Sequence, residues 1–348
     1  MKKRIFKNSK TELGIILLVV LMMFFLWWPL PDYVETPGDA NNLKTMVKIQ
    51  RRPDRDPGKL MLTSVGVIPA RPVSYLWAKL DPNDSIVSSN AITGNENNST
   101  YERVQQFYMR SAINEAIYTA FSASHHSVKK RYRGIYVVDV MRNSGLKNRV
   151  KAGDTVTEIN HRHFSSALGY QNYLKRQHVD SRVQLEFERN GTVHRTSDRL
   201  VRLPGTARPG LGVLLGDNFA VKTKLPVHVN PRKIGGPSGG LMFALQMYDQ
   251  LTHGHLKRNR IIAGTGTINA HGQVGEIGGI DKKVIAAKRR GASIFLAPYV
   301  KPTAAVRKIE PGHLTNYQLA CRTARKDAPH LKVIPVTSFR QAIRLLEK

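Results

Sequence analysis

The sequence predicts an α+β protein with an N-terminal apolar helix and a compact β-rich module in the middle of the chain. Three observations support this prediction. An uncharged apolar run occupies residues 13–31, short strand patterns alternate with turns over residues 129–205, and strands combine with long helix patterns on both sides of that module. At 348 residues, the chain is long enough for two domains that each bury a core.

The N-terminus combines a basic tail with the apolar run. Five basic residues lie in MKKRIFKNSK, and the following LGIILLVVLMMFFLWWPLP carries no charge. As a helix, the 18 residues from Leu13 to Leu30 span about 27 Å, close to a hydrocarbon thickness of about 30 Å. We therefore expect a cytoplasmic tail over residues 1–12, a transmembrane helix over residues 13–31, and the rest of the chain outside a cell membrane. A cleaved signal peptide is the alternative, but no A-x-A-like cleavage site follows the run.

A strand pattern and a long helix pattern precede the β-rich module. KLMLTSVGVI, residues 59–68, is typical of a strand, and the polar residues 81–100 are typical of a loop. A helix is predicted over residues 101–124, with Thr100 as its N-cap. Small and apolar residues at helical spacing form its predicted buried face: Val104, Phe107, Ser111, Ala112, Ala116 and Ala120. Their small size implies close approach to another element.

The β-rich module and the segment after it show clear local signals. GIYVVDV, residues 134–140, is a strand pattern, and SSALGYQNYLKRQ predicts a short helix capped by serine. RVQLEFERNGTVHR predicts a hairpin, because its Asn190-Gly191 pair fits a two-residue turn. Beyond Gly210, LPVHVN and SIFLAP are strand patterns. LMFALQMYDQLT is apolar nearly all round, which predicts a buried helix.

The module resembles a PDZ domain over residues 129–205. The matching residues are Gly153, Asp154, Val156, Ile159 and Asn160. PDZ domains cap a peptide carboxylate with the backbone N–H groups of a loop and add the peptide to a strand edge. The resemblance gives this place to YRGIY, so the expected peptide-binding residues are Arg133, Gly134, Ile135 and Tyr136, although the segment departs from the common GLGF form. The alternative is a β-rich packing module without a ligand.

The turn GGPSGG holds a candidate nucleophile, Ser238. Pro237 is suited to start a helix, which places the serine in a first turn whose backbone N–H groups lack partners. Such N–H groups can hold a developing negative oxygen. Taken alone the motif is weak, because a serine among glycines is more often a turn residue or an N-cap.

A candidate base lies 45 residues downstream, in EIGGIDKKVIAAKRRGAS. In a helix that opens near Ile280, Lys283 shares one stripe with Ile280, Val284 and Ala287, whereas Lys282 is predicted to point to solvent. A lysine acts as a base only when neutral, so its pKa must fall from about 10.4 to about 7. Burial and the positive end of a helix both act in that direction. A lysine stem that reaches the surface is the alternative.

Together these motifs strongly resemble the proteolytic domain of Lon-type Ser-Lys peptidases. The order is the GPSxG-type turn with Ser238, then GTGTI with Thr265, then the DKK helix with Lys283. The resemblance implies a ribosomal-S5-domain-2-like fold, with Thr265 orienting the lysine and backbone N–H groups around Pro237 to Gly239 holding the oxyanion. One departure is Gly235, where many Lon enzymes carry an acidic residue.

The resemblance also implies a split peptidase domain. MRSAINEA, residues 109–116, matches a helix pattern that precedes the serine in Lon peptidases. We therefore expect a first part over residues 32–125, an inserted PDZ domain over residues 126–206, and the main part over residues 207–348. This layout resembles the membrane-anchored, PDZ-containing Lon-like proteases of Gram-positive bacteria.

The function expected from this resemblance is limited proteolysis by an extracytoplasmic serine endopeptidase. No GxxxxGK[ST] phosphate loop and no zinc-type Cys/His spacing occur in the sequence, so we expect neither ATP hydrolysis, nor a metal, nor a cofactor. The expected partners are a peptide or protein substrate and the membrane. A homo-oligomer is also implied, because Lon-type domains often form rings.

The strongly basic composition adds another candidate partner. The 54 basic and 25 acidic residues give a formal net charge of +29, which favours anionic partners such as cell-wall polymers. Because the basic residues are spread along the chain, nucleic-acid binding is disfavoured. A catalytically inactive PDZ scaffold and a cationic wall-polymer binder are the two alternatives to an enzyme.

Overall fold

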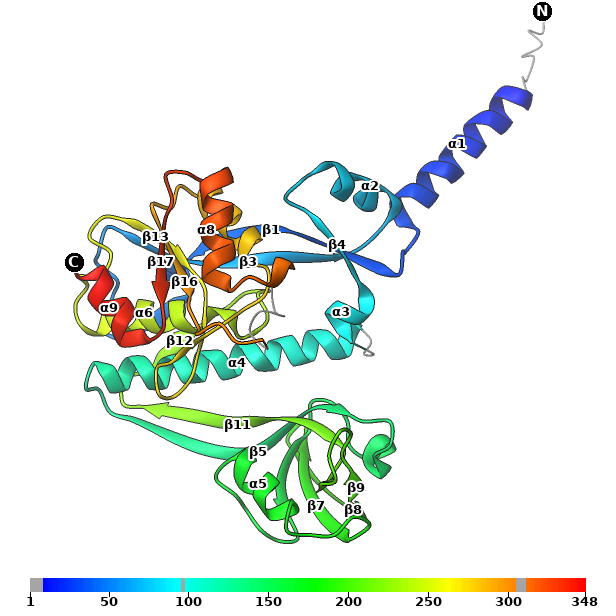
Figure 1. The fold of residues 1–348 in the computed structure, drawn as a ribbon, viewed down its shortest axis with the longest axis vertical. Coiled ribbons are helices and arrows are strands. Elements are labelled where there is room, and N and C mark those ends of the chain that lie inside the picture. Colours follow the sequence, from blue (N-terminus) through cyan, green and yellow to red (C-terminus); the bar gives the residue numbers. More distant parts are fainter. Residues whose placement is uncertain (1–8, 95–97, 305–310) are drawn as a thin grey trace, which may run out of the picture.

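The computed structural model describes residues 9–94, 98–304 and 311–348 (Figure 1). Its helices are α1 (Ser9–Trp27), α2 (Pro72–Leu80), α3 (Ser89–Thr93), α4 (Asn98–Ala123), α5 (Ala167–Leu174), α6 (Gly240–Leu251), α7 (Ile280–Arg289), α8 (Asn316–Asp327) and α9 (Phe339–Leu346). α1 projects away from two folded parts, which lie on opposite sides of the long helix α4.

A six-stranded sheet organises the first folded part. Its strands, in sheet order, are β17 (Lys332–Val336), β16 (Ile294–Pro298), β13 (Ile261–Gly264), β3 (Lys59–Pro69), β1 (Asp32–Asn42) and β4 (Ser85–Ser88). β3 from the N-terminal segment pairs in parallel with β13 from the C-terminal segment. This sheet is therefore assembled from chain segments on both sides of the β-rich module.

Helices cover both faces of this sheet, because side chains alternate between the faces along each strand. Leu60 and Leu62 of β3 pack into a core with α4, α6 and α9. Met61 between them packs into a second core with α7 and α8. The near-continuous apolar character of these strands follows from burial on both faces.

The second folded part is a five-stranded sheet with its own core. Its order is β11 (Val213–Thr223), β5 (Val128–Val140), β6 (Thr155–Ile159), β7 (Arg182–Arg189) and β8 (Thr192–Arg199). Asn190 and Gly191 have positive φ and join β7 to β8 as predicted, and Ser166 caps α5. The sequence prediction ended this module at residue 206, whereas β11 pairs along β5 and extends the sheet to Thr223.

Short strand pairs complete the described structure: β2 (Val47–Ile49) with β12 (Val227–Val229), β9 (Val201–Arg202) with β10 (Pro209–Gly210), and β14 (Thr267–Ile268) with β15 (Val274–Gly275). Two local predictions need correction. Residues 81–100 are not one loop, because they contain β4 and α3. Thr100 lies inside α4, which begins at Asn98, and is therefore not its N-cap.

The predicted transmembrane helix over residues 13–31 is not supported by the structure, although α1 forms there. Across residues 9–94, 98–304 and 311–348, none of the helices combines enough length with enough apolar character to cross a membrane. The basic tail over residues 1–12 lies largely outside the described residues.

Candidate active site

The turn that carries Ser238 is held rigidly at the start of a buried helix. Gly236 has φ 81°, a left-handed conformation that glycine adopts without a Cβ clash. A 3₁₀ turn at Pro237–Gly239 then leads directly into α6, which is almost entirely buried, as predicted. Ser238 itself stays partly exposed. A fixed backbone with an accessible hydroxyl suits a nucleophile.

Small residues around the serine allow α6 to approach its neighbours closely. A Cβ on Gly239 would lie 3.1 Å from Leu62 Cδ1 of β3, and one on Gly240 would lie 2.8 Å from Ile268 Cγ2 of β14. The Leu241 N–H group donates to the Gly266 carbonyl at 3.0 Å. The glycines after the serine therefore serve packing as well as the turn.

Lys283 and Thr265 lie together beneath this turn. Lys283 is 3% exposed and Thr265 is fully buried. The Lys283 Nζ atom donates to Thr265 Oγ1 at 3.2 Å, and Thr265 Oγ1 donates to the Ser238 carbonyl at 3.0 Å. The Gly266 N–H group donates to the same carbonyl at 2.8 Å. The structure thus connects all three predicted residues.

The direction of these hydrogen bonds constrains the lysine. A threonine hydroxyl has a single proton, and here that proton goes to the Ser238 carbonyl. Thr265 can therefore only accept from Lys283. A neutral amine carries one lone pair, which is the electron pair that takes a proton in base catalysis. The predicted stripe is also present, since Ile280, Val284 and Ala287 are all fully buried.

Lys282 was predicted to point to solvent, and this prediction is wrong. Lys282 is 4% exposed, and its Nζ atom donates to Ser85 Oγ at 2.8 Å and to Asp281 Oδ2 at 3.1 Å. Ser85 belongs to β4, the strand that the sequence analysis took for part of a loop. The side of α7 expected to be open is therefore covered.

Glu35 is a charged residue near the lysines that the sequence analysis missed. It lies on β1 directly opposite Ser85, the residue that accepts from Lys282. Burial raises the pKa of the Glu35 carboxyl, the charge of Lys282 lowers it, Asp281 raises it and Lys283 lowers it. The pKa of Glu35 is raised overall, and Glu35 interacts electrostatically with both lysines. In the sequence, Glu35 could have been noticed as the single acidic residue of YVETPG.

Gly235 lies where the serine turn contacts α4. A Cβ on Gly235 would lie 2.8 Å from Gln105 Cβ of α4, and the Gly236 N–H group donates to the Gln105 carbonyl at 2.9 Å. The serine turn is seated directly on α4. No side chain fits at position 235 without moving the turn.

The predicted peptide-binding loop is a strand in the structure. Arg133, Gly134, Ile135 and Tyr136 lie within β5, which pairs with β11 on one side and with β6 on the other. Ile135 is fully buried in the module core. Tyr136 stacks on Phe107 of α4, with ring centroids 3.5 Å apart. These residues join the module to the helix and offer no free strand edge.

β11 and β8 are the two end strands of the five-stranded sheet that the described residues form, and β11 is the one beside α4. Its C-terminal half lies against α4, where Asn114 Nδ2 donates to the Phe219 carbonyl at 2.8 Å. The N-terminal half, Val213–Gly216, follows the run GLGV at residues 210–213. The sequence analysis overlooked this run because it lies near the C-terminal end of the module, where β11 begins.

A cleft of about 520 Å³ separates the two folded parts beside α4. α4 lines it with Arg110, Ser111 and Asn114, and the β-rich module lines it with Arg133 and Asp217, among others. Val229 and Pro231, just before the serine turn, lie on its third side. The cleft therefore runs between the β-rich module and the segment that leads to Ser238.

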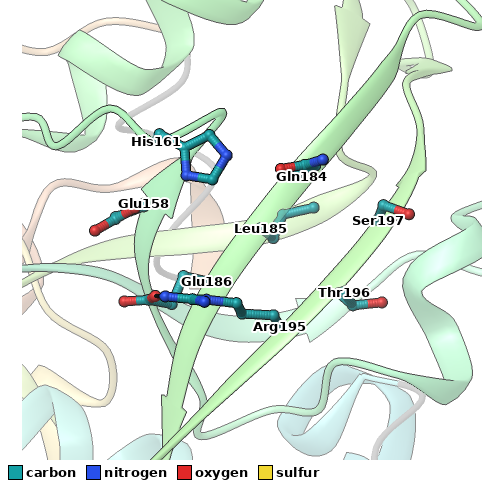
Figure 2. Close-up of a pocket in the computed structure, with 8 residues that line it drawn as sticks. All are labelled: Glu158, His161, Gln184, Leu185, Glu186, Arg195, Thr196 and Ser197. Carbon is teal, nitrogen blue, oxygen red and sulfur yellow. Dashed lines mark hydrogen bonds and ion pairs between the residues drawn. The ribbon is translucent and has the colours of Figure 1, made fainter.

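A separate hollow of about 330 Å³ lies on the outer face of β6, β7 and β8 (Figure 2). Glu186 and Arg195 occupy opposite positions on β7 and β8 and form an ion pair of 2.9 Å. His161 borders the same hollow. Glu158, which also lines the hollow, lies 2.9 Å from His163 Nε2, and none of the catalytic candidates lines it.

Family models match both folded parts. Residues 125–197 match the PDZ domain, and residues 215–312 match the Lon protease (S16) C-terminal proteolytic domain. Ser238, Thr265 and Lys283 all fall within the second match. The two matches follow each other along the chain in the predicted order.

Curated relatives match over a short region. The Lon protease of Heliobacterium modesticaldum is 34% identical over 86 residues, 24% of this chain and 10% of that protein. The Lon protease of Buchnera aphidicola subsp. Acyrthosiphon pisum is 36% identical over 86 residues, 24% of this chain and 11% of that protein. The chain thus spans about a tenth of the length of these relatives.

Solved PDZ domains are also similar to part of the chain. The PDZ domain of an SdrC-like protein from Listeria monocytogenes shares 25% identity, covers 24% of this chain and 90% of that chain, and has a TM-score of 0.24. A counterpart from Listeria innocua shares 26% identity, with coverages of 24% and 92% and a TM-score of 0.23. The chain therefore has one region that matches a PDZ domain, followed by a region that matches the Lon protease (S16) C-terminal proteolytic domain.

Proposed function

We propose that this protein is an ATP-independent serine endopeptidase in which Ser238 is the nucleophile and Lys283 is the general base. The hydrogen-bond chain from Lys283 through Thr265 to the Ser238 carbonyl supports this proposal most strongly. A buried amine held beside a partly exposed serine has no evident packing value, since burying a lysine is costly. Such a cost is typical of functional sites.

In the first half of the reaction, neutral Lys283 takes the proton of Ser238 Oγ while that oxygen attacks the scissile carbonyl carbon. The carbonyl oxygen becomes an oxyanion, which accepts from backbone N–H groups of Ser238 and Gly239 in the first helical turn. The Gly240 N–H group donates to the Pro237 carbonyl and is therefore already used. Lys283 then donates its proton to the leaving amine, and an acyl-enzyme remains.

In the second half, Lys283 takes a proton from water, which attacks the ester carbon of the acyl-enzyme. Collapse of the second oxyanion returns the proton to Ser238 Oγ and releases the new carboxyl terminus. Thr265 keeps the Nζ atom in place through both halves. It is a positioning residue, because it binds the lysine and the serine backbone and not the substrate.

The PDZ domain delivers the substrate in this proposal. An extended peptide adds to the free edge of β11 at Val213–Gly216, with its terminal carboxylate at the preceding GLGV turn. The cleft of about 520 Å³ offers a route from that domain toward the serine turn. No phosphate-binding loop motif occurs in the sequence, so we expect cleavage of flexible segments and not of folded proteins.

We also propose that α1 attaches the protein to a cell membrane and that the catalytic part lies outside the cell. Exposed apolar side chains along α1 support attachment: Leu13, Ile15, Ile16, Leu17, Leu18, Val20, Met22 and Met23 are each at least 50% exposed. The basic residues that precede α1 support a cytoplasmic N-terminus. Anionic wall polymers and a homo-oligomer stay predictions.

The orientation can be tested with a single cysteine. Cys321 is the sole cysteine of the sequence, so Val193→Cys in a Cys321→Ser background creates one exposed thiol. A membrane-impermeant maleimide should label it in intact cells. Labelling that requires cell lysis would place the PDZ domain inside and contradict the proposal.

The activity is tested by incubating the purified protein with an unstructured protein such as casein. We expect wild-type protein to cleave it, and Ser238→Ala and Lys283→Ala to lose cleavage by at least about 10³-fold. The two variants also serve as controls for a contaminating protease. Equal cleavage by all three proteins would overturn the proposal. If the protein is instead an inactive PDZ scaffold, all three proteins should fail to cleave every peptide of a broad panel.

A further inference from the structure

The helix α2 presents its largest apolar side chains to the outside. Val73, Leu76, Trp77 and Leu80 are 45%, 51%, 66% and 78% exposed. Their spacing of i, i+3, i+4 and i+7 places them on one helical stripe, which we call the α2 stripe. A surface helix normally buries such a stripe against the core and turns polar residues outward.

The orientation of α2 is fixed by packing on its opposite face. Ala78 is buried and Tyr75 partly buried in a small core with Val34 of β1 and Ile86 of β4. Pro72 starts the helix, and the Arg71 N–H group donates to Ser74 Oγ at 2.9 Å. The outward direction of the stripe therefore follows from the fold.

The α2 stripe lies where the chain leaves α1. The Leu30 N–H group donates to the Ala70 carbonyl at 2.9 Å, and the Ala70 N–H group donates to the Asp32 carbonyl at 2.9 Å. The Arg71 guanidinium donates to the Leu26 carbonyl at the C-terminal end of α1, at 3.2 Å. Figure 1 shows α2 beside that end of α1. The exposed apolar surface of α1 thus continues onto α2.

We propose that the α2 stripe inserts into the interfacial region of a lipid bilayer with anionic headgroups, next to the attachment point of α1. The sequence has three tryptophans, and all of them lie here: Trp27, Trp28 and Trp77 are 63%, 56% and 66% exposed. Tryptophan is the residue typical of the membrane–water interface.

Charge and amphipathic character favour a lipid surface over a protein partner. Arg71 and Lys79, both exposed, flank the stripe, as in helices that lie in the interface with basic groups toward anionic headgroups. The chain as a whole carries a formal charge of +29. The inference goes beyond the proposed attachment by α1, and it depends on that attachment only for the presence of a membrane.

Trp77 is itself the probe for the experiment. In the full chain, Trp27→Phe and Trp28→Phe leave Trp77 as the sole tryptophan. Vesicles contain about one third phosphatidylglycerol and phosphatidylcholine brominated high on its acyl chains. We expect a blue-shifted Trp77 emission, quenching by the brominated lipid of about half or more, and at least threefold weaker quenching by aqueous iodide. Unchanged emission and iodide quenching, with the protein bound to the vesicles, would overturn the proposal.

A second variant tests the stripe while keeping the probe. Leu76→Ser with Leu80→Ser should reduce brominated-lipid quenching at least threefold, whereas Val193→Ser, another exposed apolar residue on β8, should not. Circular dichroism in detergent verifies that each variant is folded. Trp77 emission could instead be blue-shifted without lipid, to an extent that depends on protein concentration. That result would show that a second copy of the chain covers the α2 stripe, and it would refute the lipid assignment. Casein cleavage, measured separately, tests the proposed activity and not this inference.

Discussion

At the scale of single residues, Thr265 is the link that makes Ser238 and Lys283 one site. Its hydroxyl accepts from Lys283 Nζ at 3.2 Å and donates to the Ser238 carbonyl at 3.0 Å. Without this acceptor, burial of the Lys283 amine would still cost free energy, and nothing at position 265 would hold the Nζ atom in place. For positioning Lys283, the hydroxyl of Thr265 is therefore more important than the volume of its side chain.

Replacing Thr265 separates these two properties. Thr265→Val keeps the shape and removes the hydroxyl, so we expect kcat to fall about 10²-fold with KM nearly unchanged, because the base is misplaced. Thr265→Ser keeps the hydroxyl and should restore most of kcat. Steady-state cleavage of one peptide by both variants is the measurement. If Thr265→Ser is as impaired as Thr265→Val, the positioning role is wrong.

The charges around Lys283 predict opposite pH shifts. The rate must rise with pH as the catalytic lysine becomes neutral. Glu35 favours the protonated lysine, so Glu35→Gln should move the acid limb of the pH–rate profile to lower pH. Lys282→Met removes a neighbouring positive charge and should move it to higher pH. Each shift should be up to about one pH unit. Shifts in the same direction, or none, would contradict this electrostatic role.

At the scale of elements, α4 connects the catalytic turn with the PDZ domain. Its Gln105 carbonyl accepts from the Gly236 N–H group, and two residues later Phe107 stacks on Tyr136 of β5. One helix therefore contacts both the serine turn and the β-rich module.

The close contact between α4 and the serine turn gives a prediction for Gly235. Gly235→Ala places a Cβ about 2.8 Å from Gln105 Cβ, which must displace the turn. We expect at least about a tenfold loss of kcat and a destabilisation of about 1–3 kcal/mol. Adding Gln105→Gly, which removes the clashing atom, should recover part of the kcat. A fully active Gly235→Ala variant would show that the turn is not seated as described.

Elements also mark where sequence reasoning succeeded and failed. The serine turn, α6 and the buried stripe of α7 were predictable, because local glycine and apolar patterns determine them. The burial of Lys282 was not, since it depends on β4, a four-residue strand that pairs with β1 from 50 residues earlier in the chain. The place of β11 was missed for the same reason: only pairing with β5 shows that it completes the PDZ sheet.

At the scale of the whole molecule, the five-stranded sheet lies between the two chain segments that build the six-stranded sheet, and adjacent strands connect it to them. Val128 at the start of β5 lies directly opposite Thr223 at the end of β11, so the two connections are about 5 Å apart. The six-stranded sheet and the buried residues of its two cores lie outside this insertion, and Val221 of β11 packs against one of the cores from within it. We therefore expect the six-stranded sheet and its two cores to fold without the insertion.

Excision of the PDZ domain tests this architecture. Replacing residues 129–222 by a short glycine linker should leave cleavage of a short peptide within about threefold of wild type. Cleavage of casein should fall at least about tenfold, because the substrate is no longer held. Circular dichroism and peptide turnover are the measurements. Equal loss of both activities in a folded variant would show that the PDZ domain does not act by delivery.

The most direct test of the central claim is the pH dependence of covalent labelling of Ser238 by a fluorophosphonate, followed by intact-protein mass spectrometry. Labelling requires an activated serine hydroxyl and no bound substrate. We predict that labelling rises with pH through an apparent pKa far below the usual lysine value, and that Lys283→Met abolishes it at every pH at which the variant is folded. Labelling of the Lys283→Met variant at the wild-type rate would contradict the account.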